Sequence, residues 1–295
     1  MNRKYVYLLL VILGTSFWGI SFSLVKMTVQ YTSQSVLLFY KFAIAALVLS
    51  IIFFRQLKQI DCAVWKAGMI TGAALMAGTS LQTMAIKHTS VSNAAFLSGL
   101  ATLLIPILKM TLYRKQVSPK IWFACIVALV GLYMVAVQDG FTLRSGDIWA
   151  IAGAVAFSFY IIYVGKYATA EKVIPSVITM MTCCAVGSAV MAIFDTQSVW
   201  IPLHADFWWG ILFIALPATA FMYAVSNTAQ RYIGDEGVAI AYLFEPIFAA
   251  VAGVYLLNEH LTVNTFIGGG LIILAMFISE YNFPGRKLTV KQANI

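Results

Sequence analysis

Residues 237–257 read GVAIAYLFEPIFAAVAGVYLL, and residues 263–281 read VNTFIGGGLIILAMFISEY. Each run carries a single charged residue, Glu245 in the first and Glu280 in the second. A helix that crosses a bilayer needs about 20 mostly apolar residues, and both runs have that length. Because only the short segment NEHLT separates them, the two runs predict a pair of membrane-spanning helices joined by a turn.

The composition of the whole chain agrees with these two runs. Apolar residues make up 61% of the 295 positions and charged residues only 10%, whereas an ordinary soluble domain has roughly 25% charged residues. A water-soluble fold is therefore not expected. The net charge of +8 does not indicate a nucleic-acid partner, because the basic residues lie between the apolar runs. We expect a lipid bilayer to surround the protein.

The chain divides at its polar and charged clusters into ten apolar runs, which predicts an all-α membrane protein with ten transmembrane helices. The first run has no small-residue cleavage site, so we interpret it as an uncleaved span and not as a signal peptide. The predicted spans are 6–26, 34–54, 67–86, 91–112, 119–137, 147–165, 174–194, 208–229, 237–257 and 263–281.

The positions of the basic residues predict the orientation, since cytoplasmic loops retain Lys and Arg. If the N-terminus is inside, 14 Lys and Arg residues lie in cytoplasmic segments and 3 lie in outer ones. We therefore expect a multi-pass protein of the cell inner (plasma) membrane with both termini in the cytoplasm. Lys41 and Lys109 are the two basic residues that fall inside predicted spans.

The two halves of the chain show a weak internal repeat. Shifting the sequence by 144 positions places AIKHTSVSNAAFLSGLAT (85–102) on AQRYIGDEGVAIAYLFEP (229–246), with the polar turn, the Ala-rich helix and the break in the same order. Five spans is an odd number, so the second copy is predicted to be inverted, as in many secondary transporters. The expected division is 1–140, 141–285 and a cytoplasmic tail, 286–295.

Four segments then resemble a known family. They are WGISFSLVK (18–26), KFAIAALVL (41–49), HTSVSNAAFLSGL (88–100) and the long stretch 241–278. In this order and spacing they resemble the ten-span EamA-type branch of the drug/metabolite transporter (DMT) superfamily, over essentially the whole chain. The resemblance implies two EamA-like five-helix repeats and an exporter or exchanger of amino acids, their derivatives, nucleotide-linked compounds or cationic drugs. It also implies a central cavity and alternating access.

The chain departs from the family pattern at two places. Lys41 stands where the family usually has Arg. In addition, Thr102 occupies the position that corresponds to Pro246 in the second half. The second departure predicts that the broken helices of the two halves are not fully symmetric.

Glu245 is the leading candidate for a functional site. Of the eleven acidic residues it alone lies well inside a predicted span, where a carboxylate is expensive unless it is paired, protonated or facing a wet cavity. It is a candidate for substrate binding and for proton coupling. The alternative is a structural hydrogen-bonding role at a kink, because Pro246 removes the next backbone N–H from the helix.

Helical spacing and the repeat offset extend the candidate site. Tyr242 lies on the same helix face as Glu245, Trp18 and Tyr160 occupy related places in the two halves, and Lys41 lies two turns inside its span. Polar residues here also serve as interhelical contacts, Lys side chains extend to the interface, and aromatic residues often only pack. The candidate substrate-binding residues are Glu245, Tyr242, Trp18, Tyr160, Thr79, Gln82, Thr83, Ser98, Thr102, Tyr223, Asn227 and Lys41.

The sequence contains no HExxH, GxSxG, P-loop or GxGxxG pattern, so we expect no catalytic residue, no metal and no cofactor. The predicted function is secondary transport of a small metabolite such as an amino acid or an amine, by a monomer or a homodimer. Proton coupling and facilitated diffusion both stay open. An intramembrane enzyme and a non-transporting membrane binding subunit are the competing hypotheses.

Overall fold

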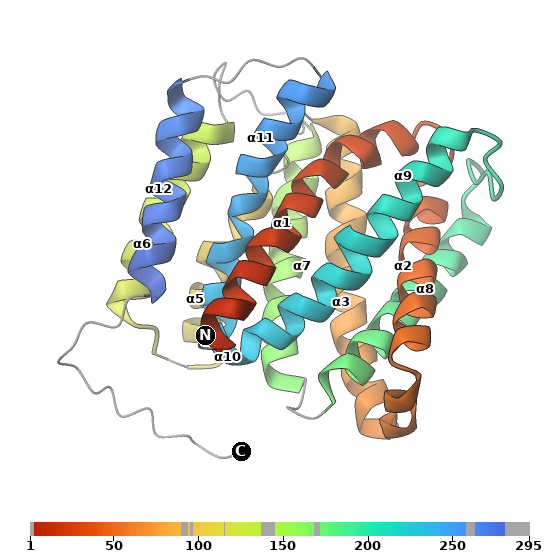
Figure 1. Cartoon of the computed structure of the whole chain (residues 1–295), viewed down its shortest axis with the longest axis horizontal. Helices are drawn as coiled ribbons and strands as arrows, with labels where there is room; N and C mark the ends of the chain where they lie inside the picture. Colours follow the sequence, from red (N-terminus) through yellow and green to blue (C-terminus); the bar gives the residue numbers. More distant parts are fainter. Residues whose placement is uncertain are drawn as a thin grey trace.

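The computed structural model describes residues 3–89, 94, 97–114, 116–136, 145–167, 172–257 and 263–280. Within these ranges the chain forms helices and contains no strand (Figure 1). The first helices are α1 (Arg3–Thr28), α2 (Gln34–Ile52), the 3-10 helix η1 (Phe54–Gln59), α3 (Cys62–His88), α5 (Ala101–Thr111) and α6 (Pro119–Ala136). The later ones are α7 (Ser145–Tyr167), α8 (Val173–Phe194), α9 (Ala205–Ala215), η2 (Leu216–Phe221), α10 (Met222–Tyr242), α11 (Phe244–Leu257) and α12 (Val263–Glu280).

The outer surface of the bundle is apolar. Leu47, Ile51 and Phe194 are 61%, 63% and 82% exposed, and soluble proteins rarely expose apolar surface on this scale. Six helical stretches of the described chain are long and apolar enough to cross a membrane, namely α1, α2, α3, α7, α8 and the stretch Ala205–Ala249. The protein is therefore an all-helical membrane protein, as predicted from its composition.

The third predicted span, 67–86, is longer in the structure, because α3 begins at Cys62. The side chain of Asp61 caps this helix: its Oδ1 accepts a hydrogen bond from the backbone N–H of Val64 at 2.9 Å. An aspartate in this position satisfies one of the backbone donors that a helix start leaves free. The helix therefore starts at its cap, ahead of its apolar run.

The eighth and ninth predicted spans are not separated by an ordinary loop. α9, η2 and α10 follow one another directly, and the backbone changes direction inside α10 at Gly234, where φ is 75° and ψ is 173°. Glycine adopts this conformation without the steric clash that a side chain would meet. Gly234 therefore ends one helical segment and begins a second one, which starts with Asp235 and Glu236.

Two helices are each broken by a single tight turn whose residue keeps helical backbone angles, with φ −59° and ψ −20° at Leu100 and φ −68° and ψ −6° at Leu243. The N–H of Leu100 donates to the carbonyl of Leu97 at 3.2 Å, and the N–H of Leu243 donates to the carbonyl of Ile240 at 3.1 Å. α5 and α11 begin directly after these turns. The first half thus has a break at Leu100 although it lacks a proline at the position of Pro246, and the asymmetry expected from Thr102 does not remove the turn.

The helices of the two halves pack mainly against each other. α3 lies against α7 and α8, α2 lies against α8, and α1 lies against α9, α10 and α11. α6 and α12 form a pair at one edge of the molecule (Figure 1). The buried core therefore combines side chains from both halves, and the broken helices contribute Ile105 and Leu243 to it.

Candidate functional site

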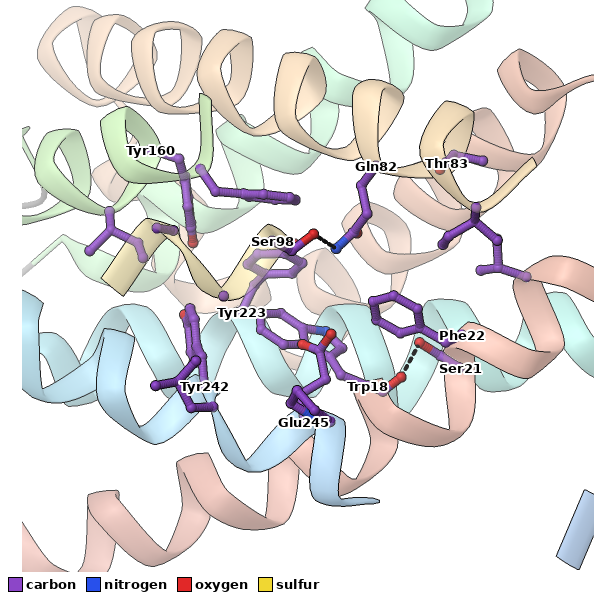
Figure 2. A pocket seen from close by; sticks show the side chains of 18 of the residues that line it. Trp18, Ser21, Phe22, Gln82, Thr83, Ser98, Tyr160, Tyr223, Tyr242 and Glu245 are labelled. Carbon is purple, nitrogen blue, oxygen red and sulfur yellow. Dashed lines mark hydrogen bonds between the residues drawn. The ribbon is translucent and has the colours of Figure 1, made fainter. Parts of the chain in front are cut away.

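A cavity of about 100 Å³ lies between the helices of the two halves. It receives side chains from α1, α2, α3, α7, α10 and α11 and from the broken region around Leu100 (Figure 2). The lining residues are Trp18, Ser21, Phe22, Val25, Leu37, Leu38, Lys41, Gln82, Thr83, Ile86, Ser98, Gly99, Ala101, Thr102, Phe157, Tyr160, Ile161, Tyr223, Ala239, Tyr242, Leu243, Glu245 and Pro246.

One wall of the cavity is a connected group of four aromatic rings. The ring of Trp18 lies 4.8 Å from that of Tyr242 and 5.5 Å from that of Tyr223, measured between centroids. Tyr223 in turn lies 5.9 Å from Tyr160, and the rings meet edge to face. Such a wall binds planar groups by stacking and cations by their attraction to the ring faces.

A π-helical turn fixes the position of Trp18. Its indole N–H donates a hydrogen bond to the carbonyl of Ala218 in η2, where Pro217 has no N–H to give to the helix. A π-helical turn leaves backbone groups outside the regular hydrogen-bond pattern, and such turns are frequent at functional sites. The indole therefore uses a carbonyl of η2 and presents its ring to the cavity.

The cavity has one acidic and one basic side chain among its described lining residues. Glu245 on α11 and Lys41 on α2 both line it. Among the described residues neither forms a hydrogen bond or an ion pair, and the Lys41 ammonium lies 5.3 Å from the centre of the Phe42 ring. Both charged groups are therefore available to a bound molecule.

Smaller polar groups complete the lining. The side-chain amide of Gln82 donates to the Ser98 hydroxyl at 3.4 Å, and the Ser21 hydroxyl donates to the carbonyl of Trp18 at 2.8 Å (Figure 2). The Thr102 hydroxyl donates to the carbonyl of Ala239 at 3.3 Å. The last bond joins the two broken helices directly beside the cavity.

Ten of the twelve candidate residues line this one cavity. They are Glu245, Tyr242, Trp18, Tyr160, Gln82, Thr83, Ser98, Thr102, Tyr223 and Lys41. Glu245 makes no hydrogen bond with the other described residues.

The other two candidates, Thr79 and Asn227, do not line the cavity. The Thr79 hydroxyl donates to the carbonyl of Leu75 at 2.9 Å, within its own helix. The amide oxygen of Asn227 accepts a hydrogen bond from the Tyr160 hydroxyl at 2.6 Å, so Asn227 holds a lining residue from behind. The repeat offset found the correct helices, but it does not specify which face of a helix turns inward.

Several lining residues on α1 are not among the twelve predicted candidates. Ser21, Phe22 and Val25 follow Trp18 at intervals of three, four and seven residues, which is the spacing of a single helix face. Helical spacing from Trp18, used in the same way as for Glu245, predicts all three of these residues. The remaining apolar lining, such as Leu37 and Phe157, carries no signal that separates it from ordinary packing.

The comparison with known proteins identifies the family. Residues 6–137 and residues 144–281 each match the EamA-like transporter family. The chain belongs to that family. The EamA-like transporters are part of the drug/metabolite transporter superfamily, so the resemblance drawn from the sequence is confirmed.

Individual EamA-like relatives agree with this assignment. An uncharacterized transporter of Archaeoglobus fulgidus is 27% identical over 263 residues, which cover 88% of this chain and 81% of the relative. The uncharacterized transporter YyaM of Bacillus subtilis is 23% identical over 292 residues, which cover 94% of each chain. One crystal structure superposes with a TM-score of 0.75 at 18% identity, covering 95% of this chain and 97% of the other, and so shares the fold.

Family membership and the names of these relatives indicate a membrane transporter. Proteins of this kind generally catalyse no covalent chemistry, which agrees with the absence of a catalytic motif in the sequence. The cavity between the two halves is the candidate site at which such a transporter binds its solute.

Proposed function

We propose that this EamA-like protein is a secondary transporter that exports or exchanges a small metabolite carrying an ammonium group, such as an amino acid or an amine. The observation that carries the proposal is the pair of opposite charges, Glu245 and Lys41, in one cavity without a hydrogen-bond or ion-pair partner among the described residues. Charges at membrane depth mark solute pathways, because an uncompensated charge there is strongly unfavourable.

The chemistry of the lining matches such a solute. A substrate ammonium group binds the Glu245 carboxylate and the faces of Trp18 and Tyr242, since aromatic rings attract cations. A substrate carboxylate binds the ammonium of Lys41. An amino acid satisfies both charges at once, whereas an amine satisfies only Glu245.

Alternating access is supported by the way the halves pack. If each helix of the first half is matched with its counterpart in the second half, the α3–α7 contact corresponds to the contact of α1 with α9 and α10. The α2–α8 contact and the α6–α12 contact each join a helix to its own counterpart. The turns at Leu100 and Leu243 exchange in the same way. This pattern fits ten spans in two inverted repeats, 1–140 and 141–285, that rock about the cavity.

The remaining features of the proposal follow from charge. The excess of Lys and Arg in alternate connections supports an orientation with both termini in the cytoplasm, and we propose that the protein lies in the inner or plasma membrane. Glu245 is the one carboxylate among the described lining residues, and it is suited to proton-coupled transport, in which it carries a proton and substrate alternately. Exchange without a proton is the other scheme, and Glu245 then serves only as a substrate ligand.

Counterflow in proteoliposomes tests the proposal. Proteoliposomes that contain the purified protein are loaded with unlabelled amino acids or amines, and uptake of the labelled compound is measured. We expect Glu245→Gln to reduce the apparent affinity by about 10–100-fold, since a hydrogen bond to a charged group contributes about 1.5–3 kcal/mol. Asp206→Asn, the same change at an exposed position of α9, is the matched control and leaves counterflow unchanged.

Two results decide between the hypotheses. Absence of counterflow with every compound of the panel, in protein that is shown to be folded, contradicts the transporter proposal and favours a binding subunit. If Glu245→Gln leaves counterflow unaltered at every pH between about 5.5 and 8, Glu245 acts neither in substrate binding nor in proton coupling.

A further inference from the structure

A second polar cluster lies outside the cavity, and the proposed function does not yet use it. The Lys109 ammonium forms ion pairs with Asp235 Oδ2 at 2.5 Å and with Glu236 Oε1 at 2.9 Å. The side-chain amide of Gln230 donates to Asp235 Oδ1 at 2.7 Å and also to the backbone carbonyl of Ile161. We call Lys109, Gln230, Asp235 and Glu236 the Lys109 cluster.

The Lys109 cluster lies directly beyond one end of the cavity. On α5, Lys109 follows the lining residue Thr102 by seven positions, which is about 10 Å along a helix. On α7, the carbonyl that accepts from Gln230 belongs to Ile161, itself a lining residue. On α10, Asp235 comes one helical turn before the lining residue Ala239.

Two glycines make this arrangement possible. Gly234, with its φ of 75°, starts a new helical segment so that Asp235 and Glu236 both stand in its first turn. Gly165 on α7 lies against the first of these: a Cβ atom at Gly165 would come within 2.5 Å of Asp235 Oδ1. The backbone of α7 therefore packs directly on the carboxylate that Lys109 binds.

The partial burial of the Lys109 cluster strengthens its ion pairs and favours either a fully closed or a fully open arrangement of the helices. The three charged side chains are only 15–20% exposed, so water screens their attraction weakly. The cluster ties α5 of the first half to α7 and α10 of the second half. Separating these helices leaves charges uncompensated in a partly buried place, so the intermediate positions are unfavourable.

A second ion pair provides a contrast. Lys172 Nζ lies 2.6 Å from Asp61 Oδ2, but these side chains are 34% and 50% exposed, and neither residue lines the cavity. Exposed pairs of this kind contribute little to holding helices together. Of these two groups of ion pairs, the Lys109 cluster is the one placed to control the cavity.

We propose that the Lys109 cluster is the closure that seals one end of the cavity, and that it must open for solute to pass to that side of the membrane. The inference rests on the proposed alternating-access transport. The intact cluster holds α5 against α7 and α10, and its rupture lets these helices separate beneath the bound solute. By the distribution of Lys and Arg, the side that it seals is the cytoplasm.

Chemical labelling tests the closure without any substrate. A cysteine replaces Ser98 in the cavity in a Cys62→Ser background, which removes the exposed native thiol. A membrane-impermeant maleimide is added to one face of proteoliposomes and then to the other. The parent protein without the Ser98→Cys change gives the background labelling of the three remaining cysteines.

We expect Lys109→Gln to accelerate labelling from the cytoplasmic face and not from the outer face. The minor state of a two-state protein is typically about 0.1–10% populated, which leaves room for about a tenfold increase. Lys109→Arg keeps the positive charge and should label at the slow rate. Lys172→Gln removes the exposed ion pair as the matched control and should also label slowly.

The outcomes separate this inference from the proposed function. Unchanged labelling of Lys109→Gln from the cytoplasmic face, in protein with a normal thermal unfolding transition, overturns the closure. Acceleration from both faces also overturns it, because that result indicates general loosening. If labelling changes as expected while the wild-type protein shows no counterflow, the closure stands and the proposed substrate class fails.

Discussion

Trp18 connects three parts of the molecule. Its indole N–H binds the carbonyl of Ala218, and its ring contacts Tyr223 and Tyr242 on the cavity wall. A change at this residue therefore acts on the cavity wall and on the π-helical turn together. Because η2 connects α9 to α10, the indole hydrogen bond also ties α1 to the part of the chain that leads to the Lys109 cluster.

At the same scale, Lys41 determines which charges the cavity accepts. Lys41→Met removes the ammonium group and keeps a long apolar side chain. We expect the affinity for amino acids to fall by about tenfold or more, since a charge-assisted hydrogen bond to the carboxylate is lost. Affinity for amines that lack a carboxylate should stay the same or rise, because no cation then competes for Glu245.

Competition of both solute classes with labelled substrate in proteoliposomes measures this change in selectivity. Lys26→Met is the control, because Lys26 is an exposed lysine at the end of α1. Equal loss of both classes of solute would show that Lys41 supports the structure of the cavity instead of reading substrate charge.

Gly234 is the decisive position at the scale of one element. Gly234→Ala places a side chain at a φ of 75°, a conformation that costs of order 1–3 kcal/mol for other residues. We expect a lower thermal unfolding temperature and faster labelling of the cavity from the cytoplasmic face, since Asp235 and Glu236 lose their position opposite Lys109. Thermal unfolding and the maleimide assay measure the two effects.

Gly270→Ala is the matched control for this change. No atom lies within 4 Å of a Cβ placed at Gly270, and its φ is not positive. Alanine there should leave stability the same or raise it by up to about 1 kcal/mol through the smaller freedom of the unfolded chain. A Gly234→Ala protein as stable as Gly270→Ala would contradict the role given to the turn.

The sequence predicts the elements that local interactions determine better than those that depend on contacts between distant segments. The apolar runs locate the helices well, because each span must be apolar over its own length. The start of α3 at Cys62 depends on the Asp61 cap, a local signal outside the hydropathy pattern. Gly99 precedes the turn at Leu100 and Pro217 lies in the π-helical turn, but a single glycine or proline inside an apolar run does not specify either turn, and both also depend on packing between helices.

At the scale of the whole molecule, some residues of the cavity region are likewise predictable from the local sequence and others are not. Glu245 is predictable because a lone carboxylate inside a span needs a reason, and helical spacing then leads to Tyr242. The ion pairs of Lys109 with Asp235 and Glu236 are not predictable from spacing, because these residues are 126 and 127 positions apart in the chain and meet only through the packing of α5 on α10. Lys109 stands near the end of its predicted span, where a lysine side chain usually extends to the interface instead of pairing inside the protein.

The packing of the halves leads to a prediction for the whole chain. The core is formed mainly between helices of different halves, with α3 on α7, α1 on α10 and α6 on α12. A half alone therefore lacks most of the surfaces that its helices need. We expect residues 1–140 and 141–295, produced as two chains in the same cell, to assemble into a protein that co-purifies and supports counterflow.

Each fragment expressed alone should be degraded or aggregate, because its inward faces stay exposed to lipid and to each other. Co-purification through a tag on one fragment, followed by counterflow, measures the assembly; the uncut chain is the reference. A single fragment that accumulates as a stable monomer with a cooperative unfolding transition would contradict a core shared between the halves. It would also contradict rocking of two mutually dependent units about the cavity, since each unit would then have its own core and the Lys109 cluster would join two separate domains.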